Sequence, residues 1–123
     1  MHIELEKKIN KYDNETYCVF LIKIFDKKTN IIVNEIYTSI NIKHGLNFDK
    51  YNLFINKIKS NKDAMFENNL FGNIHKISYY KENIIFKTEF NGVESNYTLI
   101  RIPINEDIIN VLYEIDDYLK NIS

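Results

Sequence analysis

Alternation of apolar and polar residues predicts the first strands of the chain. Over Met1–Ile9 the apolar residues Met1, Ile3, Leu5 and Ile9 fall on one face, and the polar residues His2, Glu4, Glu6 and Lys8 fall on the other, which is typical of a half-buried strand. A polar turn is expected at Asn10–Glu15. Thr16–Phe25 is apolar on both faces, so we expect a central strand there. Asp26–Asn30 then has the composition of a five-residue hairpin loop, and it leads into a long strand over Ile31–Lys43.

The pattern changes to helical spacing after residue 47. Apolar positions three and four residues apart predict a helix over Phe48–Ser60, and Asn47 is a suitable N-cap. The buried stripe of this helix is expected to hold Phe48, Tyr51, Phe54, Ile55 and Ile58. The segment Asn61–Asn73 is ambiguous, because Ala64–Phe66 is typical of a short strand whereas the Asn and Gly residues after it indicate turns.

Three further strands and a second helix complete the pattern. The strands are expected at Ile74–Lys81, Ile84–Phe90 and Glu94–Ile104, linked by Glu82-Asn83 and by the hairpin signal Asn91-Gly92. Asn105 is the expected N-cap of the last helix, whose apolar stripe is Ile108, Leu112, Ile115, Leu119 and Ile122. The order βββ-α-βββ-α predicts an α+β fold over residues 1–123 as a single domain, with a mainly antiparallel sheet and two amphipathic helices.

Composition limits the chemistry that the chain can perform. The 123 residues include one cysteine, Cys18, so neither an intramolecular disulfide nor a zinc site with several thiolates can form within the chain. No signal peptide or membrane-spanning run is present, and we expect a cytoplasmic protein. The net charge of −1 excludes a strongly basic nucleic-acid-binding domain. The excess of Ile, Asn and Lys is typical of an AT-rich bacterial or phage genome.

Candidate catalytic and metal-binding residues are few. Cys18 lies inside an apolar strand, where a thiol is usually inert. The histidines His2, His44 and His75 fall on three separate elements without the spacing of a metal site. His44 is the most interesting of them, because it precedes Gly45 at a corner between a strand and a helix. We therefore expect no catalytic residues, no metal and no cofactor, and a protein that is not an enzyme.

The two predicted helices carry opposite charge. Residues 43–62 contain five lysines and one acidic residue, a net charge of +4, whereas residues 106–120 contain five acidic residues and one lysine, a net charge of −4. An acidic helix bordered by tyrosines is suited to a protein partner with a basic surface. The predicted partner-binding residues are Glu106, Tyr113, Glu114, Asp117 and Tyr118. An alternative basic or ligand-binding patch consists of Lys43, His44, Lys57, Lys59 and Lys62. The opposite charges are equally consistent with two solvated helices packed side by side.

The segment from Ile40 to Leu119 combines a helix with aromatic and aliphatic anchors, a short apolar element at Ala64–Phe66, Gly72 before a strand, and a closing strand and helix over Ile100–Leu119. In these features it resembles the WapI-type immunity proteins, small bacterial proteins associated with contact-dependent toxins. This resemblance implies a non-enzymatic protein that binds and blocks another protein. It assigns no functional residues.

Several functions are compatible with these features. The first is an inhibitor of a protein partner, such as an immunity protein, an antitoxin or a phage anti-defence protein of the anti-CRISPR kind. The alternative is a small-ligand or nucleotide-binding domain, or a modest enzyme, that uses a cleft near Lys43, His44 and Asn61–Asn73. Nucleic-acid binding ranks lower, because the aromatic residues of the basic helix are expected in the core. Homodimerisation through a sheet edge or the last helix is a further hypothesis.

Overall fold

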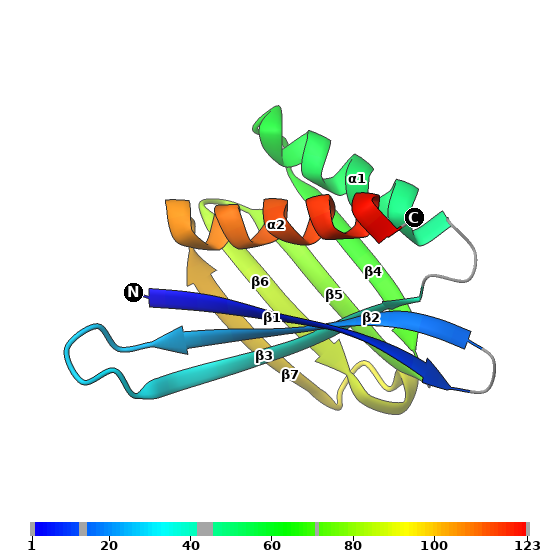
Figure 1. The fold of residues 1–123 in the computed structure, drawn as a ribbon, viewed down its shortest axis with the longest axis horizontal. Coiled ribbons are helices and arrows are strands. Elements are labelled where there is room, and N and C mark those ends of the chain that lie inside the picture. The colour runs from blue at the N-terminus through cyan, green and yellow to red at the C-terminus, as the bar shows by residue number, and fades with distance from the viewer. Residues whose placement is uncertain (1, 13–14, 42–45, 71, 123) are drawn as a thin grey trace.

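The computed structural model describes residues 2–12, 15–41, 46–70 and 72–122, and it shows an α+β fold, which confirms the predicted class (Figure 1). The strands are β1 (His2–Tyr12), β2 (Glu15–Phe25), β3 (Ile32–Asn41), β4 (Ala64–Leu70), β5 (Asn73–Tyr80), β6 (Asn83–Glu89) and β7 (Tyr97–Pro103). The helices are α1 (Leu46–Lys59), the 3₁₀ turn η1 (Phe90–Gly92) and α2 (Glu106–Ile122). Neither of the two described α-helices combines the length and apolarity needed to span a lipid bilayer.

The strands form two antiparallel sheets in sequential order. The N-terminal sheet is β1-β2-β3 and the C-terminal sheet is β4-β5-β6-β7. The central position of β2 confirms the expectation from its apolar run. The loop between β2 and β3 is closed by Asp26, whose backbone oxygen accepts from the Asn30 amide at 2.9 Å and whose carboxylate accepts from the Thr29 hydroxyl at 2.8 Å. Asn30 adopts a positive φ of 57°, which Asn tolerates better than most residues.

The structure corrects the predicted element boundaries in several places. The ambiguous segment contains a full seven-residue strand, β4, so the order is βββ-α-ββββ-α. Residues 10–12 and 15 are not a turn, because they pair across β1 and β2. The turn between β5 and β6 is formed by Lys81 and Glu82, both at positive φ, rather than by Glu82-Asn83.

The hairpin signal at Asn91-Gly92 is correct in kind, since β6 and β7 do pair. Its loop is longer than two residues, because Phe90 begins a 3₁₀ turn and its amide donates to the Asn96 carbonyl at 2.8 Å. Consequently β7 begins at Tyr97 and not at Glu94.

Helix α2 contributes to a single core that includes both sheets. Its predicted stripe is confirmed: Ile108, Leu112, Ile115 and Leu119 are fully buried, and they belong to one cluster with the inward residues of β2 and β3 and of the C-terminal sheet. Figure 1 shows α2 lying across the C-terminal sheet, with the N-terminal sheet crossing that same sheet next to it. Each large aliphatic side chain buried in this way contributes about 1.5–3 kcal/mol.

The first strand departs from the predicted pattern at one position. Ile3 and Leu5 pack against the core as expected, but Ile9 is exposed. Lys7 lies between Leu5 and Ile9 on the same face, and its ammonium group contacts Glu114 of α2 at 2.8 Å. The cover provided by α2 therefore ends near Lys7, and Ile9 lies beyond it on an edge strand.

Helix α1 packs beside α2 and closes the other side of the core. Tyr51, Phe54, Ile55 and Ile58 are buried, which confirms most of the predicted stripe. The ring of Tyr51 contacts Phe66 edge-on at 5.2 Å between centroids. The Tyr51 hydroxyl donates to the backbone oxygen of Leu112 at 2.8 Å, and this bond joins the two helices.

We predict that Tyr51→Phe lowers the free energy of unfolding by about 1 kcal/mol, because it removes a buried hydrogen bond and leaves the ring packing intact. Urea unfolding at neutral pH measures the change. Tyr80→Phe is the matched control, because Tyr80 is exposed, and its effect should stay within about 0.5 kcal/mol. Equal effects of the two variants would contradict a stabilising bond between the helices.

Candidate functional site

The predicted partner-binding residues of α2 differ in their exposure to solvent. Glu106, Glu114 and Asp117 are exposed on the outward face of the helix. Tyr113 and Tyr118 are instead half-buried and pack against the core. The acidic face is therefore presented to solvent, whereas its two tyrosines partly belong to the interior.

Three of these five residues also contact other elements of the chain. Lys7 of β1 forms an ion pair with Glu114 at 2.8 Å, and its ammonium lies 5.5 Å from the centre of the Tyr118 ring. Lys59 of α1 lies 5.1 Å from the centre of the Tyr113 ring. Lysines of neighbouring elements thus offset part of the negative charge of α2, and the oppositely charged helices do pack side by side.

The structure distributes the predicted basic patch over different sides of α1. Lys59 turns toward α2, whereas Lys57 lines a hollow beside β4 together with Leu53 and Met65. Lys62 is exposed after the end of the helix. The other two members of the patch, Lys43 and His44, lie outside the described residues. The aromatic residues Tyr51 and Phe54 of α1 are buried in the core, as predicted.

Two buried carboxylates are each paired with a lysine. The Asp116 carboxylate forms an ion pair with Lys120 at 2.9 Å. It also accepts hydrogen bonds from the side-chain amide of Asn52 at 3.3 Å. Glu89 lies 2.5 Å from Lys76, and the hydrogen bond and charge of Glu89 raise the pKa of that lysine. These carboxylates hold neighbouring elements together, and the sequence did not indicate either pair.

The single cysteine is held in its protonated form. Cys18 is fully buried in β2, and burial raises the pKa of its thiol to about 11. A thiol with that pKa supplies almost no thiolate at neutral pH. Among the residues that the structure describes, no group of three or more His, Cys, Asp or Glu side chains is arranged to hold a metal ion.

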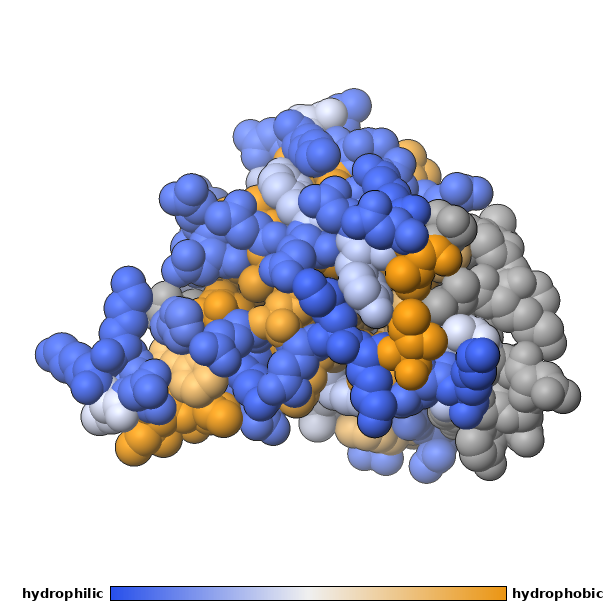
Figure 2. All heavy atoms as spheres, in the orientation of Figure 1, coloured by the Kyte–Doolittle hydropathy of each residue, from blue (hydrophilic) through white to orange (hydrophobic). Residues whose placement is uncertain are grey.

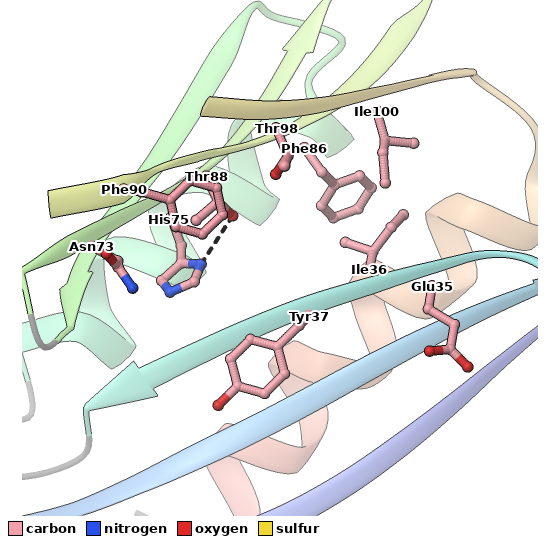
Figure 3. A pocket seen from close by; sticks show the side chains of 10 residues that line it. All are labelled: Glu35, Ile36, Tyr37, Asn73, His75, Phe86, Thr88, Phe90, Thr98 and Ile100. Carbon is pink, nitrogen blue, oxygen red and sulfur yellow. Dashed lines mark hydrogen bonds between the residues drawn. The ribbon is translucent and has the colours of Figure 1, made fainter. Parts of the chain in front are cut away.

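One hollow of the described surface is a groove between β3 and the inner face of the C-terminal sheet. It has a volume of about 360 Å³ and is lined by Glu35, Ile36, Tyr37, Asn73, His75, Phe86, Thr88, Phe90, Thr98 and Ile100 (Figure 3). Among the described residues that line this groove, only Asn73 belongs to the cleft that the sequence suggested near Lys43, His44 and Asn61–Asn73.

The groove follows a row of polar residues that crosses the whole C-terminal sheet. Cross-strand pairing places Asn68 opposite His75, His75 opposite Thr88, and Thr88 opposite Thr98. We call these four residues the polar row. The adjacent row on the same face is entirely apolar, and it consists of Phe66, Ile77, Phe86 and Ile100. The inner face of the C-terminal sheet thus changes from apolar to polar over two residues along each strand.

Strand β3 crosses the polar row and forms the opposite wall of the groove. At one end of the row the Asn68 side chain donates a hydrogen bond to the Ser39 carbonyl of β3. Farther along, the rings of Tyr37 and His75 lie 6.0 Å apart. The Nδ1 atom of His75 is 3.2 Å from the Thr88 hydroxyl, and burial lowers the pKa of the imidazole below its ordinary value of 6.5. His75 is therefore mainly neutral at neutral pH.

We predict that His75 makes stability depend on pH below neutrality. The unfolded chain takes up a proton on this residue as the pH falls through about 6.5, whereas the folded chain resists it, so stability is lost on acidification by at most about 1.4 kcal/mol per pH unit. Urea unfolding of the wild type and of His75→Gln, at about pH 7.5 and about pH 5.5, should show a smaller loss in the variant.

His2→Gln is the matched control, because it removes an exposed imidazole. A control that reduces the loss as much as His75→Gln would contradict the prediction. So would an NMR titration that places the midpoint of His75 above the ordinary value.

The chain matches no protein family model, no curated protein and no solved structure. The resemblance to the WapI-type immunity proteins therefore stays a prediction.

Proposed function

We propose that the chain binds a protein partner and blocks it, and that the contact is made at the beginning of β3. The supporting observation is a run of three consecutive apolar residues that are all exposed. Ile31 and Val33 are 62% exposed and Ile32 is 42% exposed. We call these residues the β3 tip. Figure 2 shows apolar spheres at the lower left, where the hairpin of β2 and β3 lies in Figure 1.

Exposure of the β3 tip is costly unless another molecule covers it. Successive residues of a strand point to opposite faces, so a run exposed on both faces extends beyond the packed body of the protein. Soluble proteins usually protect an open strand edge with charged residues or proline, because an apolar edge promotes association. The β3 tip has neither within its three residues. A binding surface explains this composition.

The backbone of β3 offers a second kind of contact. Among the described strands, β3 pairs only with β2, so its other edge has no neighbouring strand in its sheet. An extended segment of a partner can add to such an edge through main-chain hydrogen bonds, while side chains such as those of the β3 tip provide specificity. This mode of binding requires no catalytic group in the chain.

The observations favour the β3 tip over the acidic face of α2 as the main contact. On α2 the tyrosines are half-buried, and Glu114 is paired with Lys7. At the β3 tip all three apolar side chains are uncovered. The prediction that α2 meets a basic partner remains open to test through Glu106 and Asp117, which are exposed.

Photo-crosslinking in cells of the source organism tests this proposal. We predict that p-benzoylphenylalanine at Val33 forms a covalent adduct with one protein, and that the same group at Asn56, an exposed residue of α1, does not. With the captured partner purified, Val33→Lys should weaken binding about tenfold or more, because it places a charge in an apolar contact. Asn56→Lys should leave the affinity unchanged. The partner's own activity should fall to a plateau at one equivalent of the chain.

Two outcomes of the same experiment would contradict the proposal. An adduct that forms from Asp117 and not from Val33 would move the contact to α2. A partner whose activity is unaffected by saturating amounts of the chain would show that binding does not block it.

A further inference from the structure

We propose that the groove between β3 and the polar row binds a small, uncharged molecule with a flat aromatic ring. This inference does not rest on the proposed protein partner, because the groove is formed by other residues than the β3 tip. It assigns a ligand site to a part of the C-terminal sheet that the sequence analysis did not consider.

The shape of the groove suits one ring system. Its volume of about 360 Å³ is at the lower end of the range for small-molecule sites, roughly 300 to 1,000 Å³. Four ring side chains contribute to its lining: Tyr37, His75, Phe86 and Phe90. Figure 3 shows Tyr37 on the β3 side, and the other three on the side of the C-terminal sheet. A flat ring packed against these aromatic side chains gains contact area with little loss of conformational entropy.

The polar row is difficult to explain as part of the core. On each strand, the residue of the polar row lies two positions from a residue of the apolar row and on the same face. On β4, β5 and β6 these apolar neighbours are Phe66, Ile77 and Phe86. Threonine and histidine at such positions bury less apolar surface than isoleucine or phenylalanine would. Departures from the pattern that packing favours are expected at functional sites.

The hydrogen-bonding groups in the groove are neutral and oriented. His75 uses Nδ1 in its contact with Thr88, which leaves Nε2 for a ligand. The Oδ1 atom of Asn73 accepts from the Asn91 backbone amide at 3.0 Å, so its Nδ2 group keeps its N–H bonds without a partner among the described residues. Asn73 and His75 are two residues apart on one strand and therefore on one face, and Figure 3 shows their side chains next to each other. A ligand with acceptors and donors along one edge, as in a nucleobase, complements these groups.

The charge of the groove disfavours phosphate-bearing ligands. Glu35 is the only charged residue among the described residues that line it. Figure 3 shows its carboxylate directed away from Asn73 and His75. Because no lysine or arginine is among these described lining residues, a phosphate group would find no cation there to pair with. The site should therefore prefer a nucleoside to a nucleotide.

Titration of the full ¹⁵N-labelled chain with adenosine, followed by NMR, tests the proposal. We expect saturable shifts of the Asn73 side-chain amide and of the His75 imidazole, with a dissociation constant below the millimolar range. Tyr37→Ala should weaken adenosine binding about tenfold, because it removes one aromatic contact with the base. Tyr37 is 49% exposed, so the fold should tolerate the change.

Two controls distinguish the site from general stickiness. Tyr97→Ala removes a ring that is 50% exposed on β7 but outside the groove, and it should leave adenosine binding unchanged. AMP should bind about tenfold more weakly than adenosine, because its phosphate is charged.

Three outcomes would overturn the inference. The first is the absence of shifts at Asn73 and His75 when adenosine reaches its solubility limit. The second is an equal loss of affinity in Tyr37→Ala and Tyr97→Ala. The third is tighter binding of AMP, or of N-acetylphenylalaninamide, than of adenosine. Tighter binding of that last probe would indicate that the groove accepts an aromatic side chain of a protein.

Discussion

Burial of the apolar stripe of α2 is the interaction on which the rest of the structure depends. The stripe shares one core with both sheets, which have no strand in common. Lys7 extends this association at the surface of the N-terminal sheet, and the hydrogen bond from Tyr51 to Leu112 extends it to α1. Without α2, the apolar rows of the C-terminal sheet and the inward face of β2 would each lose a large part of their cover.

The limits of that cover explain where the proposed binding surfaces lie. The apolar rows of the C-terminal sheet are in the core with α2, whereas the polar row lies under β3 and remains partly open as a groove. The β3 tip extends in the opposite direction from the tether at Ser39, where Asn68 holds the strand against the C-terminal sheet. One strand thus contributes a wall to the groove and an uncovered apolar end.

The sequence predicts those elements whose periodicity reflects burial. The two-sided apolar run of β2 and the regular stripe of α2 were recognisable because packing alone selects their residues. Strand β4 was ambiguous, because its inward position Asn68 serves the polar row and interrupts the alternation. The groove was not predicted, since it depends on register. His75 and Thr88 are equidistant from the turn at Lys81-Glu82, and a turn placed one residue later pairs His75 with a different residue.

Native-state hydrogen exchange tests the central claim, that α2 joins both sheets into one cooperative unit and leaves the β3 tip uncovered. The account predicts that buried amides of α2, β2 and β5 exchange only through global unfolding, with one common free energy. Outward-facing amides at the β3 tip should exchange far faster. Different opening free energies for the two sheets, or protected amides at the β3 tip in the isolated chain, would contradict the account.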